Sequence, residues 1–233
     1  MIFIEIIQFS SERLVTLIGN IGISILFLFF AARILSRGEK SFRKVLFAKF
    51  FAYVSFGLIF NVIYAPFADS LLQSIGNHAV IFLTTMSLAD FVLFSYSLLE
   101  KTVTFTRKKA IIAEIVLAGV SSVYFFLPIS FKPDFSPIWD ISTIFFSLAL
   151  TQCLFIAAIV YSVQALHTMQ IAVVKRRFLW FIIGIACFEL VLIPTILRNG
   201  QLVTGTVLLV MTALEVALVP GGILIYYGVG KNV

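Results

Sequence analysis

Residues 141–166 read ISTIFFSLALTQCLFIAAIVYSVQAL and contain no charged side chain. A hydrocarbon core about 30 Å thick is crossed by roughly 20 helical residues, so this run is long enough to span a bilayer. Its apolar residues are continuous, whereas a lipid-facing barrel strand alternates apolar and polar residues. The stretch therefore predicts a transmembrane helix.

The rest of the chain repeats this pattern. Of its 233 residues, 61% are hydrophobic and only 12% are charged, about half the charged fraction of a typical soluble domain. Backbone polar groups in hydrocarbon must be bonded within their own segment, which favours helices throughout. The sequence thus predicts a single all-α domain over residues 1–233, a polytopic protein in contact with the lipid bilayer and multi-pass in the cell membrane. Its seven transmembrane helices are expected at about residues 14–35, 46–67, 79–99, 110–127, 141–166, 178–197 and 202–228.

The basic residues predict the orientation, because short cytoplasmic loops carry the excess of Lys and Arg. Seven spans place Arg13, Lys132 and Arg198 on one side and all the other basic residues on the opposite side. The N-terminus is therefore expected outside and the C-terminus in the cytoplasm. The net charge of +6 is explained by this topology signal, and no nucleic-acid partner is expected.

Acidic residues near the middle of the spans are the leading candidates for a functional site. Asp90, Glu189 and Glu215 lie near the centres of the third, sixth and seventh spans. A carboxylate in hydrocarbon is costly and most often marks a ligand or ion pathway. With no basic residue expected at that depth, these groups would be protonated or would share a proton or a cation.

Further polar residues are candidates for the same ligand- or ion-binding site. Their alternative role is hydrogen bonding between helices, which contributes on the order of 1 kcal/mol per bond. Lys49 and Glu114 are expected closer to the cytoplasmic boundary, as a structural or gating ion pair. The additional site candidates are Gln152, Asn61, Ser87, Tyr53 and Tyr64.

Helix-breaking residues in the last two spans predict hinges. Pro194 lies inside the sixth span, and Pro220, Gly221 and Gly222 follow one another in the seventh. Proline frees backbone carbonyls and permits a bend. These four residues are the hinge candidates.

Catalytic and metal-binding motifs are not found. The two histidines, His78 and His167, fall at opposite ends of their spans, so no metal site is predicted from them. No glycine-rich nucleotide loop or nucleophile elbow is present. We therefore expect neither an enzyme nor a bound metal.

Seven short-looped spans, N-out and C-in, resemble the microbial rhodopsins and the seven-helix sensor modules that precede histidine kinases. The likeness is one of topology over the whole chain. The rhodopsins bind retinal through a Lys in the last helix, whereas residues 212–216 read TALEV and the seventh span has no Lys. The resemblance therefore implies a sensor without covalent retinal, and it leaves any other cofactor open.

The resulting hypothesis is a small sensor or receptor-like protein with a polar site near the bilayer midplane. A small ligand, proton or cation would shift the bundle, and a cytoplasmic signalling protein would read the change. That partner would dock on exposed basic residues, for which Lys108, Lys109, Arg176 and Arg177 are the candidates. The alternatives are a proton- or cation-coupled transporter or channel, and a non-catalytic membrane subunit of a complex.

Overall fold

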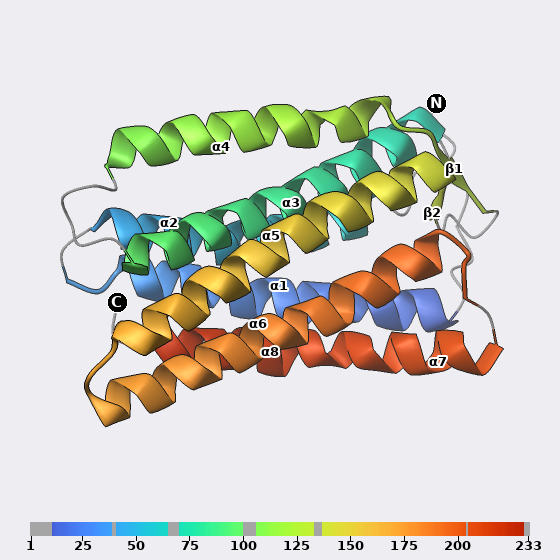
Figure 1. The fold of residues 1–233 in the computed structure, drawn as a ribbon. Helices are drawn as coiled ribbons and strands as arrows, with labels where there is room; N and C mark the ends of the chain where they lie inside the picture. The colour runs from blue at the N-terminus through green and yellow to red at the C-terminus, as the bar shows by residue number, and fades with distance from the viewer. Residues whose placement is uncertain are drawn as a thin grey trace.

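The computed structural model describes residues 11–38, 41–64, 70–99, 106–132, 137–203 and 205–230. These residues form an apolar helical bundle with one short β-hairpin (Figure 1). The elements are α1 (Ser11–Leu35), α2 (Phe42–Tyr64), α3 (Ser70–Leu99), α4 (Arg107–Ser121), η1 (Ser122–Phe126), β1 (Ile129–Phe131), β2 (Pro137–Trp139), α5 (Ile141–Thr168), α6 (Ala172–Asn199), α7 (Gly205–Leu214), η2 (Glu215–Ala217), α8 (Leu218–Ile225) and η3 (Tyr226–Gly230).

Consecutive long helices run in opposite directions, so the bundle has two distinct ends (Figure 1). The hairpin end carries the antiparallel strands β1 and β2, which pair Ile129 with Trp139. At the other end α1, α3 and α5 finish and α2, α4 and α6 begin. We call it the basic end, because it holds Arg33, Arg37, Arg43, Lys44, Arg107, Lys108, Lys109, Lys175, Arg176 and Arg177.

Six of the seven predicted spans are helices long and apolar enough to cross a membrane, among the residues described. They are longer than their apolar runs: α3 begins at Ser70, nine residues before the expected start of the third span. Polar residues extend a helix wherever water or other side chains solvate them, so hydropathy marks the depth in the membrane and not the end of the helix. The chain is a multi-pass α-helical membrane protein.

The seventh predicted span is not one continuous α-helix. α7 ends at Leu214, a 3₁₀ turn covers Glu215–Ala217, and α8 starts at Leu218. Pro220 explains the break, because its ring would clash with the carbonyl of Val216 in an uninterrupted α-helix. Pro220 is the third residue of α8. The first four N–H groups of an α-helix have no intrahelical acceptor, so the missing N–H of Pro220 costs no hydrogen bond there. The prediction of one continuous helix over residues 202–228 is therefore wrong, whereas the segment is apolar as expected.

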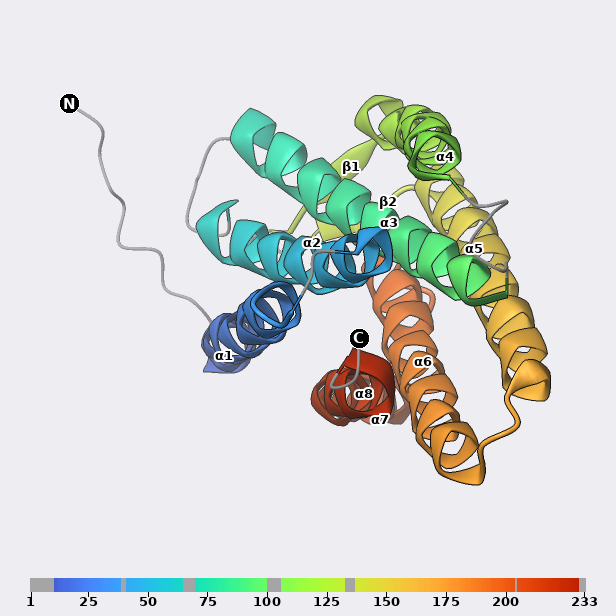
Figure 2. The same cartoon turned by 90° about the vertical axis from the view of Figure 1, so that its left-hand side faces the viewer.

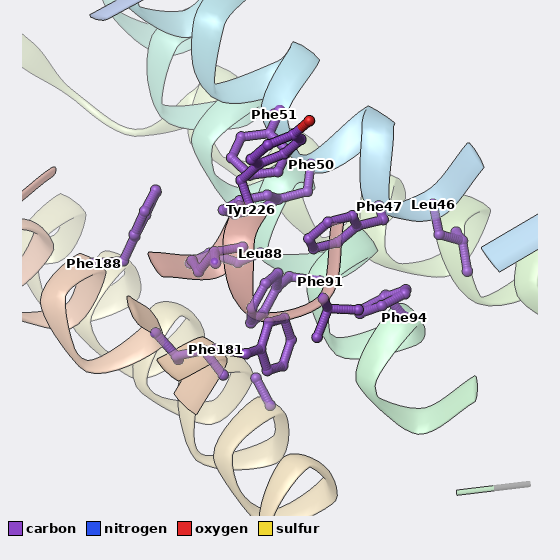
Figure 3. Packing of buried hydrophobic residues seen from close by; sticks show 14 of the residues in the cluster. Leu46, Phe47, Phe50, Phe51, Leu88, Phe91, Phe94, Phe181, Phe188 and Tyr226 are labelled. Atoms are coloured by element: carbon purple, nitrogen blue, oxygen red, sulfur yellow. The ribbon is translucent and has the colours of Figure 1, made fainter. Parts of the chain in front are cut away.

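Aromatic rings fill the centre of the bundle toward its basic end (Figure 3). Phe47 of α2 stacks on Phe94 of α3 with ring centroids 4.5 Å apart. Phe30 of α1 stacks on Tyr226 of η3 at 4.4 Å with the ring planes 7° apart. Offset and edge-to-face ring pairs add about 0.5–1.5 kcal/mol each beyond their buried area. These contacts tie the first and last segments of the chain into one core.

Two of the hinge candidates are close-packed. A Cβ on Gly221 would lie 2.8 Å from Cβ of Cys187, and one on Gly222 would lie 2.3 Å from a ring carbon of Phe27. Glycine at these positions lets α8 approach α6 and α1 closely, as small residues do between membrane helices. Their packing role is thus visible, and hinge motion at Pro194, Pro220, Gly221 and Gly222 stays a prediction.

Candidate functional site

A pocket opens at the hairpin end, between α2, α3, α5 and α6. Its cavity volume is about 120 Å³, which is smaller than most drug-sized sites and suits a small polar molecule. The lining is rich in groups that form hydrogen bonds. They are Asn61, Tyr64, Asn77, Thr84, Thr85, Tyr124, Trp139, Ser147, Thr151, Thr195, Arg198 and Asn199.

The hairpin is joined to the helices beside this pocket by backbone carbonyls near β1. Thr143 Oγ1 of α5 donates to the Pro128 carbonyl at 3.0 Å. His78 Nε2 of α3 lies 2.9 Å from the Leu127 carbonyl, and the His78 side chain is only 5% exposed. The ring also packs against Phe125 of η1, with the ring centroids 5.9 Å apart. The hairpin is thereby fixed to α3 and α5.

A chain of three side chains then forms one wall of the pocket. The Trp139 indole N–H donates to Asn77 Oδ1 at 3.1 Å. Asn77 Nδ2 donates in turn to Tyr64 Oη at 2.9 Å. All three side chains are buried. Because both functions of the Asn77 amide are used, the wall is ordered before any ligand binds.

Two buried hydroxyl groups facing this pocket have no hydrogen-bond partner among the described residues. Tyr124 of η1 is 0% exposed and Ser147 of α5 is 1% exposed, and neither Tyr124 Oη nor Ser147 Oγ forms a hydrogen bond. The Thr85 and Ser147 hydroxyls lie near Tyr124 Oη, but the Tyr124 oxygen forms no well-oriented hydrogen bond with either. Thr85 instead donates to the Ile81 carbonyl at 2.9 Å. A buried hydroxyl without a partner costs about 1–3 kcal/mol, so both are available to a bound molecule.

Of the described residues that line this pocket, Arg198 alone carries a formal charge. It stands in the last turn of α6, next to Asn199. A positive group in a poorly solvated pocket favours ligands that carry an anionic or strongly polar group.

The predicted site residues are distributed over several places. Asn61 and Tyr64 line the hairpin-end pocket. Gln152 Nε2 of α5 donates to Glu189 Oε1 of α6 at 2.5 Å, and both side chains are half-buried. Among the described groups no hydrogen bond or ion pair joins Glu189 to Asp90. Glu189 and Asp90 thus have different partners in this arrangement.

Ser87 and Glu215 contribute no observed site contact. Ser87 Oγ is buried and donates to the Thr84 carbonyl of its own helix at 2.6 Å. The backbone of Glu215 begins the 3₁₀ turn between α7 and α8. Its side chain lies outside the described part of the structure, so its candidacy stays a prediction.

Asp90 has a basic partner, contrary to the sequence-based expectation. Its Oδ1 lies 3.3 Å from Lys49 Nζ, and the same ammonium lies 2.7 Å from Glu114 Oε2. The predicted Lys49–Glu114 ion pair is confirmed. Both residues come seven positions after the first residue of their helices, Phe42 and Arg107, which is about two turns. Tyr53 also belongs to this group, since Lys49 Nζ lies 5.5 Å from its ring centroid.

The docking candidates lie at the basic end, in two pairs on different helices. Lys108 and Lys109 are in the first turn of α4, and Arg176 and Arg177 lie near the start of α6. All four side chains are exposed. They are at the end of the bundle opposite the pocket.

Several pocket residues were missed as candidates by sequence reasoning. Asn77 precedes the expected third span, and Trp139 lies between the expected fourth and fifth spans. The available signal was a cluster of polar and aromatic residues beside the proline-rich segment 128–137, which predicts a stiff external loop. Among the described residues, no group of three His, Cys, Asp or Glu side chains is placed to hold a metal ion.

Comparison with known protein families gives no match, and no curated protein resembles the chain at a significant level.

Proposed function

We propose that this protein is a membrane receptor that binds a small polar molecule in the hairpin-end pocket and passes the signal to the basic end. The observation that carries the proposal is the pair of buried hydroxyl groups, on Tyr124 and Ser147, that face the pocket and have no hydrogen-bond partner among the described residues. A ligand that accepts or donates hydrogen bonds removes their desolvation cost. Binding is then favoured over the unliganded state.

The orientation follows from the charge distribution. Short cytoplasmic loops carry the excess of Lys and Arg, so the basic end is the cytoplasmic one and the hairpin end lies outside. The pocket then receives its ligand from the outer side.

α5 and α6 supply the route to the other side. Both line the pocket near the hairpin end and both run to the basic end, where Arg176 and Arg177 are exposed. A ligand that contacts Ser147 of α5 and Thr195 of α6 biases the relative placement of these helices. A cytoplasmic partner with an acidic surface, docked on Lys108, Lys109, Arg176 and Arg177, reads that change.

The test is a thermal-unfolding screen of the purified protein in lipid nanodiscs against amino acids, mono- and dicarboxylates and monosaccharides. A true ligand raises Tm, since a ligand at 100 times its Kd adds about 2.7 kcal/mol to the stability. Tyr124→Phe and Ser147→Ala are the decisive variants. Each removes an unpaired hydroxyl, so the unliganded stability stays equal or rises, while the ligand-induced rise in Tm is lost.

Ser162→Ala is the matched control on the same helix. Ser162 is buried in α5 and donates to Ser95 Oγ at 3.2 Å, away from the pocket. This variant is expected to lower Tm slightly and to keep the full ligand response. A panel that gives no Tm rise, or a rise that persists in both hydroxyl variants, contradicts the receptor proposal.

A proton- or cation-coupled transporter is the second candidate, favoured by the carboxyl groups buried inside the spans. Asp90 lies against Lys49, and Glu189 against Gln152. Proteoliposomes under an imposed pH gradient and potential separate the two functions. The receptor gives no flux, whereas a transporter gives flux that Asp90→Asn or Glu189→Gln removes.

A further inference from the structure

A second polar cluster lies between α2, α3 and α4, far from the hairpin-end pocket. Lys49, Asp90 and Glu114 come from three consecutive helices that pack side by side (Figure 2). Lys49 and Glu114 follow the start of their helices by seven residues, and Asp90 precedes Leu99, the end of α3, by nine. At 1.5 Å per residue the cluster is about 10–14 Å from the basic end of these helices. It therefore lies inside the apolar part of the bundle.

The charges of this cluster do not balance when all three groups are ionised. One ammonium contacts two carboxylates, at 2.7 Å for Glu114 and 3.3 Å for Asp90. The sum is one negative charge at a site where the Asp90 side chain is 0% exposed. An uncompensated charge in such a medium is strongly disfavoured, and the ordinary remedy is uptake of a proton.

The geometry of the two carboxyl groups points to the place of that proton. The Asp90 and Glu114 carboxyl groups share one ammonium, because Lys49 Nζ lies 3.3 Å from Asp90 Oδ1 and 2.7 Å from Glu114 Oε2. Two ionised carboxylates brought to one ammonium repel each other, and a single proton on the pair removes that repulsion. Asp90 Oδ2 is buried and, among the described groups, has no donor to satisfy it.

No further charged group is found around Asp90 among the residues that the structure describes. The titratable groups that face Asp90 are Lys49 and Tyr53 of α2 and Glu114 of α4, and α5, packed on α3 as well, adds none. Tyr53 places its ring 5.5 Å from the Lys49 ammonium, a cation–π contact that keeps the lysine charged. A metal cation does not fit, because the ammonium already lies between the two carboxylates and Ca²⁺ requires six or more oxygen ligands.

We propose that Asp90 and Glu114 share one proton, in a proton-binding site that Lys49 holds together. The neutral state has one proton on the carboxyl pair and one positive charge on Lys49. Glu114 and Lys49 are 19% and 29% exposed, whereas Asp90 is fully buried, so the proton reaches Asp90 past Glu114.

The site also controls how α4 is held. Ala110 and Ser121 are the buried residues of α4, and most of its apolar side chains point outward. The bond from Glu114 to Lys49 is thus a main polar attachment of α4 to α2. Loss of the shared proton adds a net negative charge to this contact and loosens α4.

Infrared spectroscopy of the full chain in lipid nanodiscs tests the proposal across a pH titration. We expect one titrating band of a protonated carboxyl group that disappears in both Asp90→Asn and Glu114→Gln. Either variant leaves a single carboxylate that Lys49 balances, so no proton is needed. Glu189→Gln, which changes a buried acid of a different pair, leaves this band in place.

A second readout requires no substitution. Labelling of all aspartates with ¹³C at the side-chain carboxyl shifts the band, because Asp90 is the buried aspartate of the described chain. No band removed by the two variants, a band removed by only one of them, or a band insensitive to aspartate and to glutamate labelling overturns the shared-proton site.

Discussion

The indole N–H of Trp139 donates to Asn77 Oδ1 at 3.1 Å, although 62 positions separate the two residues in the chain. Asn77 also donates to Tyr64 Oη, so one amide connects α2, α3 and β2. This contact positions the hairpin over the pocket.

We expect Asn77→Leu to lower the stability by about 1–3 kcal/mol, because the buried Trp139 N–H and Tyr64 hydroxyl each lose a partner. Trp139→Phe removes the donor and keeps an aromatic ring. In a double-mutant cycle measured by unfolding in bicelles, the double variant should cost less than the sum of the single ones. Additive losses would show that the two side chains stabilise the protein independently.

Gly184 and Gly19 form a matched pair of helical glycines. A Cβ on Gly184 would lie 2.6 Å from Ile225 Cγ1 and 2.8 Å from the Gly221 carbonyl oxygen, so backbone would have to move. Gly184→Ala is expected to destabilise the protein by about 1–3 kcal/mol or more. Gly19 has nothing within 4 Å of its added Cβ, so Gly19→Ala should be neutral or stabilise by about 0.5–1 kcal/mol. Equal Tm values for the two variants would contradict the close crossing of α6 and α8.

Asp140 caps the N-terminus of α5, outside the apolar part of the helix. Its carboxylate accepts hydrogen bonds from the Ser142 N–H at 3.1 Å and the Ser142 hydroxyl at 2.9 Å. These bonds lower the pKa of Asp140 below its ordinary value of 3.8. The cap therefore stabilises the fold above that value, and its contribution is lost as the pH falls through the lowered pKa.

Asp140→Asn provides the comparison for this pH dependence. Asparagine is an equally good N-cap and does not titrate. Unfolding curves between pH 7 and pH 3 should give similar Tm values for the two proteins at neutral pH. Toward acid pH the native protein should lose Tm relative to the variant. Parallel profiles would mean that the carboxylate does not act as the cap.

The membrane orientation is tested with single cysteines in a Cys153→Ser, Cys187→Ser background. Ser130 of β1 and Lys108 of α4 are exposed at opposite ends of the bundle. A membrane-impermeant thiol reagent added to intact cells should label Ser130→Cys at once, and Lys108→Cys only after permeabilisation. The reverse pattern would invert the orientation and place the pocket in the cytoplasm.

The sequence by itself determined that this is an all-α membrane protein, and it located six apolar helices, α4 taken with η1, with ends correct to within four residues except that α3 and α6 begin nine and six residues earlier than expected. The reason is local: a segment in hydrocarbon must be apolar and must bond its own backbone. The Lys49–Glu114 pair was also accessible, since both residues lie near the same end of neighbouring spans.

Tertiary structure alone decided the remainder. Hydropathy does not encode which faces of the helices meet, so it could not place Lys49 against Asp90 or separate Asp90 from Glu189. The helix breakers Pro220, Gly221 and Gly222 signalled an irregularity in the seventh span, but the position of the 3₁₀ turn at Glu215–Ala217 came from the structure. The pocket exists only because Asn77, Tyr124, Trp139 and Ser147 are brought together from distant parts of the chain, by packing forces that act between helices and not along them.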